Sequence, residues 1–282
     1  MKRREGSVKA SAGEATEEKR VGKTGRKEVD IEAWVIENIR EFVELSGLSL
    51  LKLTREQYVD LLHDLLTQLY GSPTTHTSVE TVVKRYNRHK DSINEMIANR
   101  LVFMFEELAP EQLDFVVLNV RDSSLVVAPR IYHQLVREGR EDLTEILRIK
   151  WFNAWVSRKY RLPPLTCPIC RFNALMPDLT CIVCGATVSE SLLRKTVDFE
   201  KALLRFLEEL QCDELKNLLN YDTMLLNSEG LKHPASARTP VDIEIYLSAG
   251  EKKLMRETYI KRCRSSRDEG IKRSKGLDGV SV

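Results

Sequence analysis

The sequence lacks the motifs by which most enzyme classes are recognised. It has no glycine-rich phosphate loop followed by Lys and Ser or Thr, no Gly-x-Ser-x-Gly elbow, and no two histidines spaced i, i+4 around a glutamate. The missing motifs are those of nucleotide-cleaving enzymes, serine hydrolases and zinc metallohydrolases, so the sequence does not indicate any of these three classes. We therefore expect a protein that is not an enzyme and has no small-molecule substrate. An enzyme whose site is assembled only by the fold stays open as an alternative.

Long apolar segments and a dense set of cysteines are also missing. No segment reaches about 18 apolar residues, and no apolar core follows the basic start of the chain, so we expect neither a membrane-spanning helix nor a secretory signal. The 282 residues contain only six cysteines, which is too few for a secreted disulfide scaffold. This predicts an intracellular protein in a reducing environment, in the cytoplasm, the nucleus or the nucleoid.

Four of the six cysteines form two C-x-x-C pairs, Cys167 with Cys170 and Cys181 with Cys184, separated by ten residues. Four thiolates at this spacing can surround one ion at tetrahedral angles, which suits Zn²⁺. Because four thiolates leave no coordination position for water, we expect a structural ion and not a catalytic one. A redox dithiol or disulfide pair and an iron–sulfur centre are the alternatives. The remaining two, Cys212 and Cys263, each read as solitary.

Residues 165–188, under a tenth of the chain, resemble a zinc ribbon built from two knuckles. In that family the two cysteine pairs bind one structural zinc, so the resemblance implies that Cys167, Cys170, Cys181 and Cys184 are its ligands. Arg171 stands where the family usually has glycine. The ten-residue spacer is expected to form a small hairpin, with Pro177-Asp178 at its turn.

Composition and periodicity divide the chain. Residues 1–28 contain no aromatic residue and predict a disordered basic tail, and glycine, serine and charge over 266–282 predict another. Apolar residues at helical spacing predict a helical domain over 29–160. A zinc ribbon over 161–188 and a smaller helical segment with one strand over 189–265 are expected to follow. The fold class is thus mainly α, a multi-helix domain with an inserted four-cysteine zinc ribbon and a second, smaller helical segment.

Individual elements are also predicted. Residues 78–108 keep helical phase, as one long helix or two that meet near Asp91-Ser92. After the ribbon we expect one helix from Ser189 or Ser191 to Leu210, one helix over 213–226, and a loop over 227–240. Alternation over 241–247 predicts a strand, and Ser248 with Glu251 predicts the capping box of a helix that continues to about Arg264.

Positive charge gathers at particular places in a chain whose net charge is only +2. Residues 1–28 hold 9 basic and 5 acidic side chains and residues 252–282 hold 10 and 4, whereas the part between them is acidic. Basic side chains beside the ribbon are Lys150, Arg158, Lys159, Arg161 and Arg171, and those of the last predicted helix are Lys252, Lys253, Arg256, Lys261 and Arg262. Such clusters can contact phosphate backbones, although solvated surface charge is the simpler reading.

The helix predicted over 141–160 carries Trp151 and Trp155, four residues apart on one face. This spacing fits a buried stripe, and stacking of exposed rings on nucleic-acid bases is the alternative. We therefore expect a non-catalytic zinc protein associated with nucleic acid, DNA or RNA, through the basic residues near the ribbon and at the termini. The alternative is a protein–protein adaptor or regulatory subunit in which the ribbon is only a brace.

Overall fold

The computed structural model describes residues 30–70, 77–158 and 161–264. The two predicted disordered tails and Lys159 lie outside these residues. These described residues divide into two compact units, one formed by 30–46, 53–70 and 77–84, the other by 47–52, 85–158 and 161–264. Within the described residues, no helix is both long enough and apolar enough to cross a membrane.

The first unit is helical. It contains α1 (Ile31–Ser46), α2 (Arg55–Tyr70) and the start of α3 (Val79–Arg88). Helices α1 and α2 pack together through apolar stripes that the sequence predicts, including Trp34 and Phe42 of α1 and Leu61 and Leu65 of α2. The Trp34 indole Nε1 donates a hydrogen bond to the Thr77 carbonyl at 3.0 Å, which ties the segment after α2 to α1.

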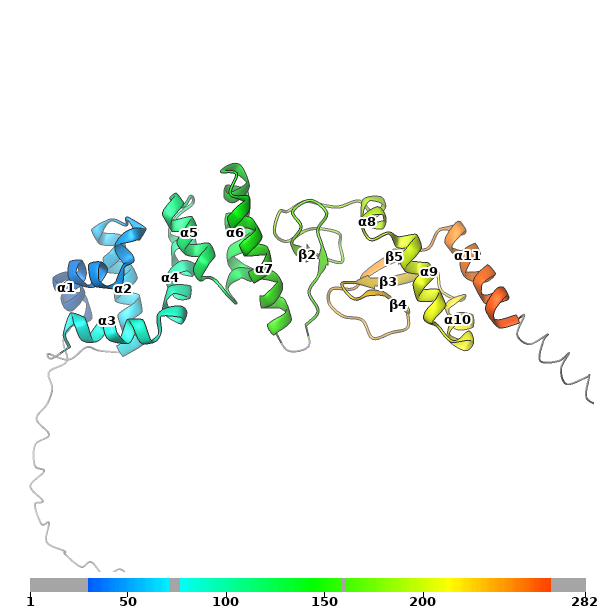
Figure 1. Ribbon diagram of the computed structural model, residues 1–282, viewed down its shortest axis with the longest axis horizontal. Coiled ribbons are helices and arrows are strands. Elements are labelled where there is room, and N and C mark those ends of the chain that lie inside the picture. Colours follow the sequence, from blue (N-terminus) through cyan, green and yellow to red (C-terminus); the bar gives the residue numbers. More distant parts are fainter. Residues whose placement is uncertain (1–29, 71–76, 159–160, 265–282) are drawn as a thin grey trace, which may run out of the picture. The chain divides into compact units, whose positions relative to one another are not determined.

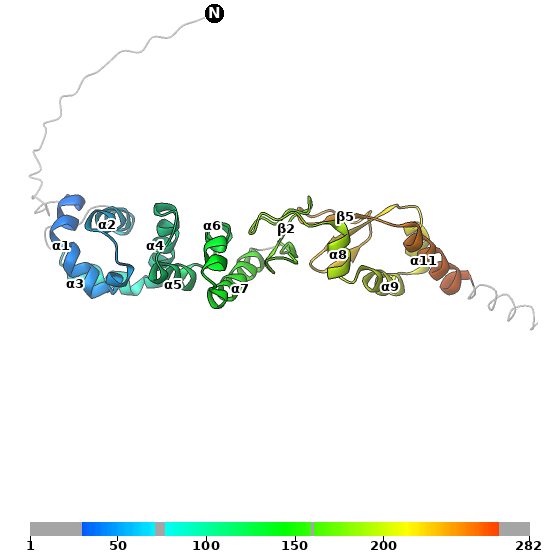
Figure 2. The same cartoon turned by 90° about the horizontal axis from the view of Figure 1, so that it is seen from above.

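The second unit begins with two helical hairpins. Helix α4 (Lys90–Met104) pairs with α5 (Pro110–Asn119), and α6 (Ser124–Arg137) pairs with α7 (Glu141–Ser157), as Figure 1 and Figure 2 show. The open question over residues 78–108 is answered by two helices, α3 and α4, with His89 between them. Short connections make neighbours in sequence neighbours in space, and the fully buried residues Leu101, Leu113, Leu135, Leu147 and Trp151 form the core of these hairpins.

A three-stranded sheet and short helices follow the ribbon. The elements are α8 (Glu190–Thr196), α9 (Phe199–Glu209), α10 (Cys212–Leu218), β3 (Thr223–Asn227), β4 (Gly230–Lys232), β5 (Ile243–Tyr246), α11 (Ala249–Tyr259) and a final π-helical turn, η2 (Ile260–Arg264). The strands are antiparallel in the order β4-β3-β5, so β3 is central. The fold class is confirmed: the described chain is mainly helical, and the four cysteines lie between its two helical parts.

Three element predictions in this region need correction. The helix expected to run to Leu210 is two helices, α8 and α9, because Asp198 adopts a left-handed φ of 49° between them. The helix expected over 213–226 ends at Leu218, and its last residues form β3. The expected loop over 227–240 contains β4. Strand β5 and the Ser248–Glu251 capping box are confirmed.

The reading of Cys212 and Cys263 as solitary is wrong, because the two form a disulfide. It joins the first residue of α10 to η2, and the 51-residue separation encloses the whole sheet and α11. Beside it, the Arg262 guanidinium donates hydrogen bonds to the Leu207 and Leu210 carbonyls at the end of α9. Disulfides are rare in reducing compartments, so this bond does not support the predicted reducing, intracellular setting. That setting stays a prediction.

A buried carboxylate organises the loop between β4 and β5. Asp242 accepts hydrogen bonds from the Thr239 N–H at 2.6 Å and the Asn227 amide at 2.8 Å, and it pairs with the Lys232 ammonium at 3.3 Å. Burial raises the pKa of this carboxyl group, but the hydrogen bonds outweigh burial and the net pKa lies below its usual value. Sheet and loop are therefore held by one charged group.

Candidate metal centre

The four cysteines of the two C-x-x-C pairs lie around one point. All four Sγ atoms fall within 4.8 Å of one another, with Cys167 and Cys184 at 3.9 Å and Cys170 and Cys181 at 3.5 Å. A Zn–S bond of about 2.3 Å in tetrahedral geometry places sulfurs about 3.8 Å apart, so the spacing fits a single ion. Cys184 is partly exposed, and the other three cysteines are buried.

The two knuckles have the same backbone hydrogen bonds. In the first, the Arg171 N–H donates to the Cys167 carbonyl and the Cys167 N–H donates to the Phe172 carbonyl, at 2.9 and 2.8 Å. In the second, Gly185 and Cys181 make the equivalent bonds, the latter to Ala186, both at 2.9 Å. Each turn ends in a left-handed residue, with φ of 64° at Arg171 and 72° at Gly185. Arg171 therefore adopts the conformation for which glycine is the usual residue.

The spacer between the knuckles folds back on itself, as the sequence predicts. Within the spacer, an isolated antiparallel bridge joins Leu175 to Cys181, and strand β2 (Asn173–Leu175) also pairs with β1 (Leu165–Thr166), which precedes the first knuckle. The turn closes when the Leu179 N–H donates to the Met176 carbonyl at 2.9 Å. This fold-back brings the sulfurs of the second knuckle next to those of the first.

Phe172, two residues after Cys170, fixes the ribbon to helices α6 and α7. Its buried ring makes edge-on contacts with Tyr132 of α6 and Trp151 of α7, with centroids 5.8 and 5.9 Å apart. The Trp151 indole also donates to the Asn173 carbonyl at 2.8 Å. Trp151 is thus a core residue, whereas Trp155 is partly exposed.

Arg148 makes a second link from α7. Its Nε donates to the Cys170 carbonyl at 2.9 Å, and its Nη1 contacts Glu141 and Glu145, each at 2.7 Å. The side chain is only 12% exposed. By binding the backbone of Cys170, this guanidinium holds the first knuckle in place. This role could not be predicted from the sequence, in which Arg148 is one of several basic residues on a helix.

The pKa values of the cysteine thiols in the cluster differ from one another. Hydrogen bonding between the Cys170 and Cys181 sulfurs, 3.5 Å apart, lowers the pKa of one thiol of this pair and raises the pKa of the other. Burial raises the pKa of Cys184 to about 11. One sulfur of this pair is thus available to a cation as a thiolate. Metal binding would then deprotonate the others, because a coordinated sulfur is a thiolate.

The basic residues predicted beside the ribbon are not equivalent. Lys150 donates to the Leu118 carbonyl at 2.6 Å, and burial lowers its pKa, so its ammonium group caps α5. Arg158 at the end of α7, Arg161 before β1 and Arg171 in the first knuckle are exposed. Their guanidinium groups have no hydrogen-bond or ion-pair partner among the described residues.

On α11 and η2, several of the predicted cations contact other groups. Lys252 pairs with Asp222, Lys253 lies 3.8 Å from Glu257, and Arg262 caps α9. Lys261 is exposed and interacts within the fold, and Arg256 is exposed without a partner in the described chain. The suggestion that all ten basic residues contact nucleic acid stays a prediction.

The arrangement can hold one soft cation and anchor it to two helices. Within the described residues, this is the group of four thiol ligands that converge on one point. Comparison with protein-family models, curated proteins and solved structures finds no match for the chain.

Proposed function

We propose that the chain is a zinc-braced, non-catalytic nucleic-acid-binding protein. Cys167, Cys170, Cys181 and Cys184 would hold one Zn²⁺, whose four bonds to sulfur exclude water and substrate. The observation that supports this most is the convergence of four sulfurs within 4.8 Å, with the exposed and unpaired Arg171 next in sequence to Cys170. A single ion is favoured over an iron–sulfur cluster, since a cluster distributes its thiolates over several iron atoms.

The binding surface in this proposal consists of Arg158, Arg161 and Arg171. The Arg161 N–H donates to the Arg158 carbonyl at 3.0 Å, which holds the backbones of the first two close together, and Arg171 belongs to the first knuckle. Guanidinium groups without acidic neighbours remain available to phosphate oxygens, which they bind in pairs of hydrogen bonds. The ion would support this surface by fixing the knuckle from which Arg171 projects.

The test combines metal analysis with binding measured against salt. The purified protein should contain one zinc per chain, and a labelled single-stranded oligonucleotide of about 20 nucleotides should bind less tightly as salt rises. Changing Arg158, Arg161 and Arg171 to Gln should reduce the slope of log K against log salt by about 2.

The matched control changes Lys201, Arg205 and Lys216 to Gln. These three exposed cations lie on α9 and α10 and have no partner among the residues that the structure describes. The control removes the same charge and should leave the slope nearly unchanged. Binding that is absent, or that both triple variants weaken equally, would refute the proposal.

One observation favours the second candidate, a protein–protein adaptor. Ile149, Phe152 and Val156 form a stripe on the outer face of α7, and they are 54%, 42% and 53% exposed. Exposed apolar stripes of this kind mark docking surfaces for protein partners. A single protein partner that co-purifies in fixed stoichiometry, is lost on Phe152→Ser, and comes without nucleic acid would favour this candidate over the first.

A further inference from the structure

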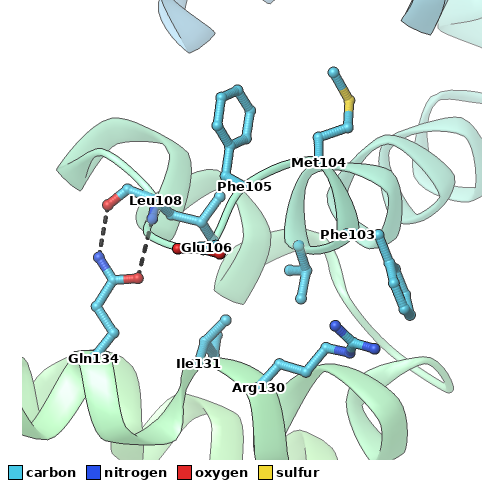
Figure 3. A pocket seen from close by; sticks show the side chains of 9 residues that line it. Phe103, Met104, Phe105, Glu106, Leu108, Arg130, Ile131 and Gln134 are labelled. Atoms are coloured by element: carbon cyan, nitrogen blue, oxygen red, sulfur yellow. Dashed lines mark hydrogen bonds between the residues drawn. The ribbon is translucent and has the colours of Figure 1, made fainter.

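A pocket lies between helix α6 and the segment that joins α4 to α5. Its volume is about 350 Å³, and its lining comes from Val102 to Glu106, Leu108, Arg130, Ile131 and Gln134. Figure 3 shows Met104 and Phe105 directed away from it, whereas Ile131 points into it from α6. The floor is therefore apolar and the rim is charged.

The pocket is held open by an amide that pairs with the backbone. The Gln134 side chain accepts from the Leu108 N–H at 3.0 Å and donates to the Leu108 carbonyl at 2.7 Å, the two bonds drawn in Figure 3. Gln134 is itself buried. The joining segment thus keeps a fixed distance from α6, and the pocket needs no rearrangement to accept a ligand.

Two opposite charges face this pocket, and neither is neutralised. The Arg130 guanidinium of α6 lies over the Phe103 ring, 4.0 Å from its centroid. Glu106 lines the pocket from the segment between α4 and α5. In the described part of the chain, neither group has a hydrogen-bond or ion-pair partner. By contrast, Glu107, which follows Glu106, pairs at 2.7 Å with Arg137, seven residues after Arg130 on α6. Arg130 and Glu106 are therefore available to a ligand.

We infer that this pocket binds an unpaired base of a single-stranded nucleic acid, with guanine as the preferred base. This rests on the proposed nucleic-acid function. A flat ring can stack on the guanidinium, which is itself stacked on the half-exposed Phe103. Guanine also presents two adjacent N–H donors on its Watson–Crick edge, and the two oxygens of the Glu106 carboxylate can accept both.

Other ligand classes fit the charges less well. A phosphate or an acidic peptide would pair with Arg130 but would be repelled by Glu106, and a simple cation would meet the reverse problem. A base is neutral, stacks on the cation and donates to the anion, so it satisfies both groups at once. Uracil has the same flat face but only one donor on that edge.

The experiment compares the oligonucleotides UUUGUUU and heptauridine by fluorescence anisotropy with the zinc-loaded full chain. The guanine oligonucleotide should bind several-fold more tightly. Phe103→Ala should weaken its binding roughly tenfold to a hundredfold, and Glu106→Gln should lower its affinity to that of heptauridine. Neither change should alter the salt slope, because neither removes a phosphate contact.

Val136→Ala, at an exposed apolar position of α6 outside the pocket, and Glu208→Gln, at an exposed acidic position of α9, are the controls and should have no effect. Normal affinity and guanine preference in both pocket variants would overturn this inference alone. Failure of the wild-type chain to bind either oligonucleotide would overturn it together with the proposed function. Binding of a hexapeptide rich in aspartate at Arg130, with no response to guanine, would assign the pocket to protein instead.

Discussion

Removal of the disulfide between Cys212 and Cys263 should destabilise the part of the chain that it encloses. The separation of 51 residues sets the chain entropy that the crosslink removes from the unfolded state. The loop-entropy relation gives about 14 cal/mol/K for this length, or about 4 kcal/mol at 25 °C. The double variant Cys212→Ser, Cys263→Ser should therefore lower the free energy of unfolding of this region by up to about 4 kcal/mol.

Amide hydrogen exchange is the appropriate assay. Trp34, Trp151 and Trp155 all lie outside the enclosed region, so tryptophan fluorescence would not report on it. Exchange of the buried β3 amides, such as that of Leu225, should become faster by up to about a thousandfold, since 1.4 kcal/mol corresponds to a factor of ten. The amide of Leu113 in α5 is the internal control and should not change.

Two results would refute this reasoning. Alkylation of the denatured, unreduced protein could label Cys212 and Cys263, which would show that the bond does not form. Alternatively, the double variant could exchange like the wild type, which would show that the enclosed region is held by its packing alone. Reduction of the wild type should reproduce the effect of the double variant.

Three further predictions concern the ribbon and the sheet. Cys170→Ser should abolish stoichiometric metal binding and speed exchange in α7, whereas unchanged metal content would exclude Cys170 as a ligand. Arg171→Gly should raise the melting temperature, because it relieves roughly 1 kcal/mol of left-handed strain; a lower melting temperature would contradict the φ of 64°. The lowered pKa of Asp242 means that its stabilisation is present above about pH 4 and is lost as the pH falls through the pKa of the folded state, so denaturation midpoints should fall there. Asp242→Asn should be less stable at pH 7 and should show a smaller loss below pH 4; a midpoint that is independent of pH in the wild type would be evidence against this account.

The cysteine cluster could be predicted from the sequence because its geometry is local. A C-x-x-C turn places both sulfurs on one side through bonds between residues four and five positions apart, and the hairpin returns the second pair. Helical periodicity located most of the helices for the same reason. What could not be predicted is the attachment of the ribbon: the Arg148–Cys170 contact joins residues 22 positions apart, and nothing in either residue indicates the other.

The errors have identifiable physical causes. Met224, Leu225 and Leu226 form a continuous apolar run, which periodicity alone cannot assign to a helix or a buried strand. Asp198 interrupts a regular apolar pattern by its backbone conformation, which the pattern does not record. The Cys212–Cys263 pairing depends on where the fold brings η2, so two widely separated cysteines gave no signal.

Helix α6 carries contacts of two kinds on adjacent residues. Tyr132 touches Phe172 of the first knuckle, while Ile131 and Arg130 line the pocket. If an ion held by the four cysteines fixes the position of Phe172, its binding would also affect the helix that shapes the pocket. Thermodynamic linkage would make this relation mutual: a base in the pocket would raise the affinity for the ion by the same factor by which the ion would raise the affinity for the base.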